Sequence, residues 1–301
     1  MLITFSLFLM ILSVYSGFPV AALALGIGLS LIFNIHKDFY TKKIGTRLLQ
    51  TGIVLMGLSI NFTEALTVTK IYLPIISIFV LFVFILALIL GKIIGIDKRF
   101  TLLIAAGTSI CGGTAMAAIT PIIKAKPEDL AAGISIIFIL NAIGIIFFPI
   151  IGQALNLSEV QFGAWVATAI HDTSAVIGAS LNYGSYSVET AATLKLTRTL
   201  WLIPLMIFLT FKMKSEEKKF QLPVFVIFFI IAIILGSFID LPFNSSEIKK
   251  FSQVFLLLGL FSIGSQISRE TLKNFTTDRL LFTSSLWLLV IPISYFLVSI
   301  M

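Results

Sequence analysis

The chain has 301 residues, of which 58% are hydrophobic and only 12% are charged, with a mean hydropathy of +1.09. Soluble domains are nearer half apolar and a quarter charged, so this composition excludes a soluble protein and predicts one integral membrane domain over 1–301. The net charge of +7 comes from Lys and Arg clusters between apolar runs, a pattern of cytoplasmic loops and not of a nucleic-acid-binding surface.

The apolar runs predict an all-α membrane protein of ten or eleven transmembrane helices, at about 20 residues for each spanning helix. They cover 2–14, 18–34, 47–66, 71–95, 101–124, 129–152, 160–182, 188–211, 221–239, 250–268 and 279–300. The first run lacks the basic start and the cleavage site of a signal peptide, so we expect it to be retained as a helix.

The charges between these runs predict which loops are cytoplasmic, because cytoplasmic loops carry an excess of Lys and Arg. Four basic loops share one side if every run spans: Lys37, Lys42, Lys43 and Arg47; Lys98 and Arg99; Lys212, Lys214, Lys218 and Lys219; and Arg269, Lys273 and Arg279. Two loops fit poorly, because Asn156 to Gln161 would be inside without a basic residue and Lys124 with Lys126 would be outside. Both would change sides if 101–124 and 160–182 were re-entrant hairpins, and the sequence leaves both arrangements open.

Two polar stretches interrupt apolar runs near their middle, at 107–114 (Gly-Thr-Ser-Ile-Cys-Gly-Gly-Thr) and at 168–174 (Thr-Ala-Ile-His-Asp-Thr-Ser). Non-helical backbone at membrane depth is tolerated where it lines a protein-enclosed cavity. Paired interruptions of this kind point to the substrate site of a secondary transporter. The alternative is that Gly and Thr only allow helices to pack closely, as small residues do in membranes.

Charged residues deep in the apolar runs are few, and they fall at or near the second interruption. Asp172 is the deep carboxylate, His171 precedes it, and Lys195 with Arg198 lie three residues apart on one helix face. Such residues face an interior cavity and have partners, because a charge at the bilayer centre costs at least about 2.5–3.5 kcal/mol. An internal ion pair of Asp172 with either cation is one reading. The other is that two cations against one carboxylate complement an anionic substrate.

The interruptions also predict half-helices whose N-termini could hold an oxyanion. Gly112 and Gly113 would free the backbone, Thr114 would cap the half-helix that follows, and Asp172, Thr173 or Ser174 would cap the other. Cys111 is expected to be a small residue that lines the site, and His171 with Asp172 to exchange protons. Two His and one Cys make no tetrahedral metal site, and no nucleotide or nucleophile motif is present, so we expect no metal, no cofactor and no enzyme activity.

At these residues the chain resembles the sulfate exporter family, a group of uncharacterised bacterial inner-membrane proteins. The resemblance covers most of the chain and is carried by Arg47 to Leu55, Gly107 to Gly112, His171-Asp172 and Lys195 to Arg198. The family commonly has His-Glu where this chain has His171-Asp172. It is similar in turn to the class of cation/proton antiporters and bile-acid symporters. That class implies two inverted five-helix repeats with broken helices that meet at mid-membrane. The implied partner of 101–124 would then be 250–268, broken around Gly259 to Gln266.

These observations together predict a secondary transporter, an exporter by the resemblance, that carries a small anion such as sulfate, sulfite or an organosulfonate by alternating access, coupled to protons. The expected substrate-binding residues are Ser109, Cys111, Gly112, Gly113, Thr114, Thr173, Ser174, Lys195, Arg198, Ser265 and Gln266. The alternative is a cation/proton antiporter that uses Asp172, and the third reading is a non-transporting membrane sensor or subunit. The expected partners are the anion, protons and the lipid bilayer, without nucleic acid. Substrate identity, transport direction and oligomeric state, a homo-oligomer included, stay open.

Overall fold

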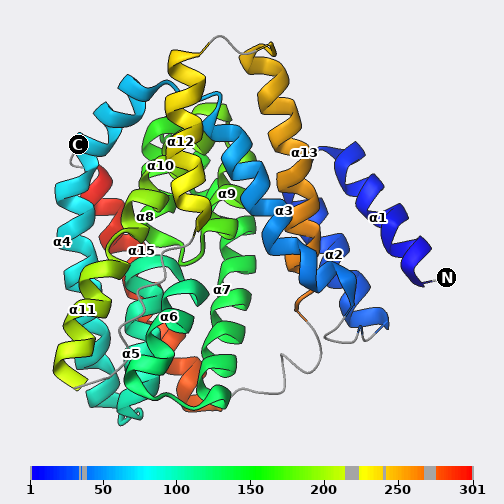
Figure 1. Cartoon of the computed structure of the whole chain (residues 1–301). Helices are drawn as coiled ribbons and strands as arrows, with labels where there is room; N and C mark the ends of the chain where they lie inside the picture. The colour runs from blue at the N-terminus through cyan, green and yellow to red at the C-terminus, as the bar shows by residue number, and fades with distance from the viewer. Residues whose placement is uncertain are drawn as a thin grey trace.

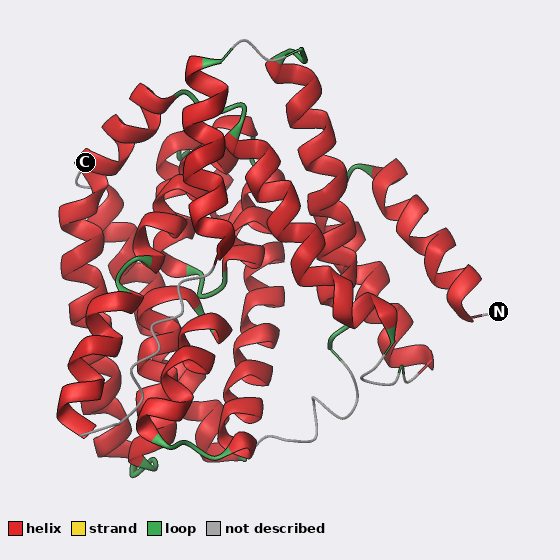
Figure 2. Ribbon diagram, in the orientation of Figure 1, coloured by secondary structure: helices red, strands yellow, loops and turns green. Residues whose placement is uncertain are grey.

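A computed structural model describes residues 2–33, 35, 39–213, 224–239, 242–267 and 276–299 of the chain. Helices and the loops between them make up all of these residues, and no strand occurs among them (Figure 2). The expectation of an all-α protein is therefore confirmed.

The helices form two bundles that lie side by side (Figure 1). The small bundle consists of α1 (Leu2–Ser16), α2 (Pro19–Phe33), α3 (Tyr40–Gly57), α12 (Val224–Phe238) and α13 (Ser245–Gly264). The large bundle consists of α4 (Phe62–Ile94), α5 (Lys98–Ala106), the π-helical turn η1 (Gly107–Cys111), α6 (Gly113–Ile123), α7 (Pro127–Ala154), α8 (Glu159–Ala169), α9 (Thr173–Leu181), α10 (Ser185–Thr199), α11 (Leu202–Met213) and α15 (Thr277–Ser299).

Small residues hold the small bundle together by letting its backbones approach closely. A β-carbon added to Gly26 of α2 would lie 2.0 Å from the carbonyl oxygen of Phe261 on α13. One added to Gly264 of α13 would lie 2.3 Å from the carbonyl oxygen of Leu23 on α2. Glycine is required at both positions, because helices in lipid associate through close packing and not through a hydrophobic driving force.

Four helical stretches of the described residues are long and apolar enough to cross a membrane: 62–94, 127–154, 185–213 and 277–299. Shorter apolar helices are α1, α2, α6 and α12. The outer surface is apolar as well: on α4, Ile78, Ile85 and Ile93 are each more than half exposed. An exposed apolar surface of this kind suits lipid and not water, which agrees with an integral membrane protein.

The apolar run 160–182 folds into a hairpin of α8 and α9, called hairpin 2, whose two ends lie together. The Glu159 carboxylate at the start of α8 accepts a hydrogen bond from the Tyr186 backbone N–H at 2.8 Å, just beyond the end of α9. The Tyr183 hydroxyl donates to the Leu157 carbonyl at 2.6 Å, and its ring stacks on Phe162 with 3.8 Å between centroids. The run therefore enters and leaves the bundle at the same end.

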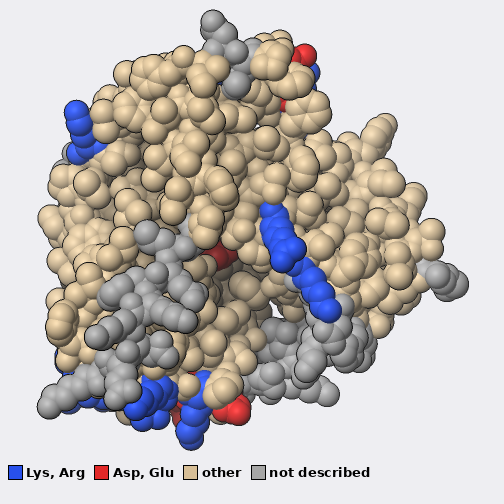
Figure 3. All heavy atoms as spheres, viewed as in Figure 1, with Lys and Arg blue, Asp and Glu red and all other residues tan. Residues whose placement is uncertain are grey.

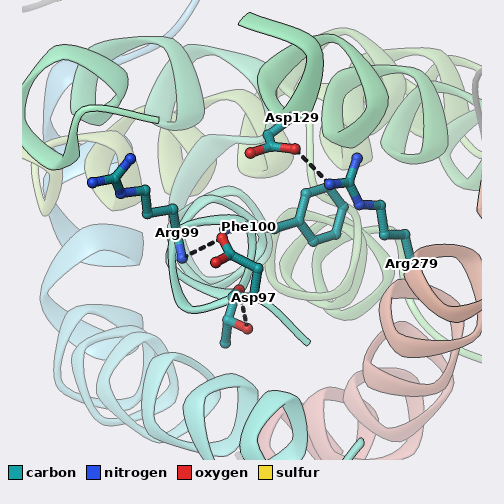
Figure 4. A network of polar contacts seen from close by, with 6 residues as sticks. Asp97, Arg99, Phe100, Asp129 and Arg279 are labelled. Carbon is teal, nitrogen blue, oxygen red and sulfur yellow. Dashed lines mark hydrogen bonds and ion pairs between the residues drawn. The ribbon is translucent and has the colours of Figure 1, made fainter. Parts of the chain in front are cut away.

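The run 101–124 folds likewise into a hairpin of α5, η1 and α6, called hairpin 1, at the opposite end of the large bundle (Figure 1). Arg279 ties its ends together: the guanidinium lies 4.6 Å from the centre of the Phe100 ring in α5 and pairs at 2.5 Å with Asp129, which begins α7 after the hairpin (Figure 4). Asp97 caps α5 by accepting from the Arg99 backbone N–H at 2.9 Å. Near the tip, a β-carbon on Gly107 would lie 3.1 Å from Met116 Cγ, so the two arms run antiparallel.

The two hairpins bear on one question that the sequence left open and on one expectation drawn from the family resemblance. The runs 101–124 and 160–182 do not cross the bundle, so the re-entrant alternative is the correct one. In the run 250–268, α13 continues through Gly259 and ends at Gly264, inside the interval where a break was expected, and residues 268–275, which follow, lie outside the described residues. The first interruption contacts the second one, and the two hairpins approach each other from opposite ends.

The hairpins also explain the two loops that fitted poorly. The start of α5, with Lys98 and Arg99, lies at the same end of the molecule as the loop from α6 to α7, which contains Lys124 and Lys126 (Figure 1). The loop from α7 to α8, which contains Asn156, and the end of α9, next to Asn182, lie at the other end. We call the first the basic end. Of the remaining basic residues predicted to be cytoplasmic, Lys37, Lys214, Lys218, Lys219, Arg269 and Lys273, and the side chain of Lys42, lie outside the described residues.

The hairpin arrangement predicts a labelling pattern that two spanning segments would not give. Single cysteines at Lys98 and Lys124 should react with an impermeant thiol reagent from one side of the membrane, and cysteines at Asn156 and Asn182 from the other. The measurement is labelling of intact cells against inverted vesicles, in a Cys111→Ser background. Opposite sidedness within either pair would contradict the hairpin.

Candidate functional site

The tips of the two hairpins meet in the middle of the large bundle. Gly112 has φ 61° and ψ −131°, a conformation that residues with a β-carbon rarely adopt, and it forms the turn between η1 and α6. A β-carbon there would lie 3.3 Å from both Cα and Cβ of Asp172 at the other tip. Aligned without gaps, 108–115 and 168–175 match Gly112 with Asp172, so equivalent positions of the two hairpins are in contact.

Arg198 of α10 binds backbone carbonyls of both tips. Its Nε donates to the Ser109 carbonyl at 2.6 Å and Nη2 donates to the Thr108 carbonyl, both in hairpin 1. Its Nη1 donates to the Ala167 and Thr168 carbonyls of hairpin 2 at 3.0 and 2.7 Å. One planar guanidinium thus satisfies four carbonyls that would otherwise have no partner in an apolar interior.

Lys195, one helical turn before Arg198, also binds a backbone carbonyl, at the tip of hairpin 2. Its Nζ donates to the Ile170 carbonyl at 2.7 Å, and its side chain is fully buried. Both cations therefore sit at the negative, C-terminal ends of half-helices, where a positive charge is stabilising. Among the described residues neither cation forms an ion pair with Asp172, so the internal ion pair considered from the sequence is absent there.

The N-terminal ends of the two half-helices differ in their capping. Asp172 caps α9 by accepting from the Ser174 backbone N–H at 3.0 Å, as one of the three candidates from the sequence. The helix α6 begins at Gly113 with Gly112 as its N-cap, and no side chain caps it. Thr114 is therefore not the cap that was predicted, because the helix begins one residue earlier. The first N–H groups of α6 have no acceptor within the helix.

A cavity of about 500 Å³ opens beside this uncapped N-terminus, between the two bundles (Figure 3). It is lined by Thr46 of α3, by Gly113, Thr114, Ala117 and Ala118 of α6, by Ile134 and Phe138 of α7, by Asp172 and Ser174, and by Ile263 and Gln266. Asp172 is the charged residue of this lining. A polyatomic ion fits the volume, and backbone N–H groups, hydroxyls and one carboxylate are available to it.

The structure brings some of the predicted site residues to this cavity and not others. Gly113, Thr114, Asp172, Ser174 and Gln266 line it. Gly112 and Thr173 are buried in the tips, as is Cys111, which is 2% exposed and does not line the cavity. Ser109, Lys195 and Arg198 lie behind the tips, and Ser265 is buried against Thr41, with 2.8 Å between the hydroxyl oxygens. The positive residues thus act on the cavity through the tips and not by direct contact.

Sequence reasoning missed Asn141, which lies in the middle of α7 beside the second tip. Its Oδ1 is 3.3 Å from Nδ1 of His171, and both residues are buried. His171 does not line the cavity, whereas Asn141 lines a small recess that continues it. The signal was present: a single Asn stands within the apolar run 129–152, and polar residues at that depth usually have a partner.

Two opposed hairpins with a cavity at their tips, within an apolar outer surface, define an integral membrane protein built around a central site with polar groups. The family model described as conserved hypothetical protein 698 matches residues 3–284. The chain is 37% identical to a UPF0324 membrane protein of Bacteroides thetaiotaomicron, with 90% of this chain and 83% of that relative covered. A UPF0324 membrane protein of Vibrio parahaemolyticus is 35% identical, with 89% of each chain covered. No solved structure matches the chain.

The chain therefore belongs to the UPF0324 family of membrane proteins. The family membership suggested by the sequence motifs is confirmed at this level. The names of these relatives describe membrane proteins and state no substrate, so the substrate and the mechanism have to be argued from the site.

The role of Arg198 predicts that its loss affects folding before it affects binding. Arg198→Gln should lower the stability of the protein in detergent by at least about 3 kcal/mol, because each unsatisfied buried carbonyl costs about 1–3 kcal/mol. Arg99→Gln, in the first turn of α5 at the basic end, is the matched control and should unfold like the unmodified protein. Thermal unfolding followed by size-exclusion fluorescence measures both. An Arg198→Gln protein as stable as the control would contradict the tip-binding role.

Proposed function

We propose that the protein is a secondary transporter of a small anion, and that the anion binds at the uncapped N-terminus of α6. The observation that carries this proposal is the difference between the two tips. Asp172 supplies a cap for α9, whereas Gly112 leaves the N–H groups of α6 open to a cavity. A helix N-terminus with free N–H groups and about half a positive charge is an anion site in many proteins.

The charge balance around the tips supports an anion over a cation. Two C-terminal and two N-terminal half-helix ends meet there, so their partial charges cancel. Lys195 and Arg198 then stand against the single carboxylate of Asp172, which leaves one excess positive charge. The excess rises to two positive charges when Asp172 is protonated. In both states an anion reduces the excess, whereas a cation would increase it in a region of low dielectric constant.

The position of Asp172 supports coupling to protons. It lines the same cavity as the α6 N-terminus. An anion 4 Å from an ionised carboxylate would be repelled by about 4 kcal/mol at an effective dielectric constant near 20. The anion and a proton on Asp172 therefore bind together, which would link the two in transport. In this proposal Asp172 carries the proton, and Thr114 and Ser174 add hydroxyl donors.

The contact between the bundles supports alternating access. At the end opposite the basic loops, Lys249 of α13 pairs with Glu189 of α10 at 2.7 Å and so joins the two bundles. The cavity instead lies toward the second turn of α3, at Thr46, and the last turn of α13, on the other side of the tips. By the distribution of Lys and Arg the basic end would be cytoplasmic. The structure would then correspond to an inward-facing state in a bacterial inner membrane, with nine spanning helical segments and two hairpins among the described residues.

The proposal predicts pH-dependent anion binding that Asp172→Asn removes. Binding of sulfate, sulfite or methanesulfonate by the purified protein should tighten as the pH falls, by up to about tenfold per pH unit for one proton taken up. In Asp172→Asn the affinity should be independent of pH, because a permanently neutral side chain cannot take up the proton. Isothermal titration calorimetry over several pH values measures this. PH-dependent binding that persists in Asp172→Asn would contradict the role of Asp172.

A cation/proton antiporter is the second candidate, because Asp172 is the charged side chain that lines the cavity. In that case the unmodified protein would bind Na⁺ and no anion, and Asp172→Asn would lose Na⁺ binding. The same titrations with Na⁺ in place of the anion distinguish the two functions.

The ion pair between the bundles predicts a change in accessibility when it is broken. In Lys249→Met a cysteine at Val188, which is buried between the bundles at the same end, should react faster with an impermeant thiol reagent, because the closed end opens more often. The neighbouring exposed Lys250→Met is the control and should leave the rate unchanged. Equal rates in the two variants would show that this ion pair does not hold the end closed.

A further inference from the structure

The small recess beside Asp172 contains an unpaired hydrogen-bond donor. Nδ2 of Asn141 is buried and has no partner in the described part of the chain. The recess measures about 10 Å³ and is lined by Asn141, Asp172, Ser174 and apolar side chains that include Phe138 and Ile263. It shares Phe138, Asp172, Ser174 and Ile263 with the large cavity and so continues it. About 10–15 Å³ by this measure accommodates one water-sized atom.

The orientation of the Asn141 amide in the structure pairs its oxygen with an Nδ1–H tautomer of His171. Its Oδ1 faces Nδ1 of His171, which leaves the NH₂ group to face the recess. His171 makes no other side-chain hydrogen bond among the described residues, since its Nε2 has no partner. A buried donor without an acceptor costs about 1–3 kcal/mol. Such a cost is typical of a group that is satisfied only when a ligand is bound.

We propose that Asn141 is a specificity-determining residue of the anion site, whose NH₂ group donates to one oxygen atom of a bound oxyanion that enters the recess. The inference rests on the proposed function and refines it. One oxygen of the ligand occupies the recess while the others face the α6 N-terminus and Ser174. This arrangement selects a polyatomic oxyanion over a halide, because a single spherical ion cannot occupy the recess and the α6 N-terminus together. His171 is then a positioning residue that acts through Asn141.

The alternative is that Asn141 and His171 only join α7 to the second tip, as polar residues do between membrane helices. That role would use the amide oxygen alone and would not require an NH₂ group in a recess beside Asp172. The two readings differ in what ligand binding should show when the amide is replaced by an apolar group of similar size.

The test is equilibrium binding of methanesulfonate, sulfate and chloride to the purified full-length protein at low pH. Asn141→Leu should weaken methanesulfonate and sulfate binding by about ten- to a hundredfold, the effect of losing one hydrogen bond to a charged ligand, and leave chloride binding unchanged. Thr283→Val is the control: it also replaces a buried polar group on a long helix, where Thr283 bonds the Arg279 carbonyl at 2.9 Å, and lies outside both cavities. It should bind all three anions normally.

A double-mutant cycle tests the positioning role of His171. His171→Phe should weaken oxyanion binding less than Asn141→Leu, and the double variant should bind no worse than Asn141→Leu, because His171 acts through Asn141. The double variant should also be at least as stable as Asn141→Leu, since both polar partners are then gone. If Asn141→Leu does not fold, Asn141→Ala removes the same donor without added bulk.

Three outcomes would overturn the inference. Asn141→Leu that binds oxyanions as tightly as the unmodified protein would exclude contact with the ligand and leave the proposed function standing. Equal loss of oxyanion and chloride binding would show a general disturbance of the site. If the unmodified protein binds none of the three anions, the proposed anion transport fails, and the role of Asn141 fails with it.

Discussion

The structure depends on satisfying backbone carbonyls where two hairpins end inside an apolar bundle. Each tip exposes the C-terminal end of a half-helix, and water is not available there to bond it. Arg198 bonds four of these carbonyls and Lys195 a fifth, all from one face of α10. The cost of burying two cations is offset by charge-assisted hydrogen bonds and by the negative ends of the half-helices. Without them neither tip could hold a non-helical turn at this depth.

In the proposed function this arrangement separates the residues that support the tips from those that bind the anion. The two cations bind the C-terminal ends of the half-helices at the tips. The cavity lies on the opposite side, at the N-terminal ends of the half-helices α6 and α9. The two tips are equivalent by alignment, yet one carries Asp172 and the other Gly112 at the matched position. Because of that single difference, the N-terminus of α9 is capped by a side chain, whereas the N-terminus of α6 has no side-chain cap. A functional asymmetry therefore arises within an otherwise symmetric pair, at the one place where the two hairpins touch.

Much of the architecture could be predicted from the sequence, because apolar runs, interruptions and loop charges are local signals. The interruptions at 107–114 and 168–174 were placed correctly, and so were the deep residues Asp172, Lys195 and Arg198. The sequence could not decide whether the interrupted runs cross the membrane or fold back as hairpins, since an 11-residue half-helix and half of a spanning helix have the same composition. The partners of Lys195 and Arg198 were also out of reach, because the sequence gives no information on which carbonyls lie nearby. Asn141 carried a signal, a single Asn in an apolar run, that was not used.

The order in which the chain is synthesised gives the contacts of Arg198 a further consequence. Its acceptors in hairpin 1 lie 89 and 90 residues earlier in the chain, and those in hairpin 2 lie 30 and 31 residues earlier. Both hairpins are therefore synthesised before the residue that satisfies their tips. Neither is long enough to cross the bilayer twice as independent helices, and each has unpaired carbonyls until α10 arrives. The hairpins must wait at the membrane surface or in the insertion machinery, and their entry is a late, long-range step of biogenesis that requires α10 to be already in place.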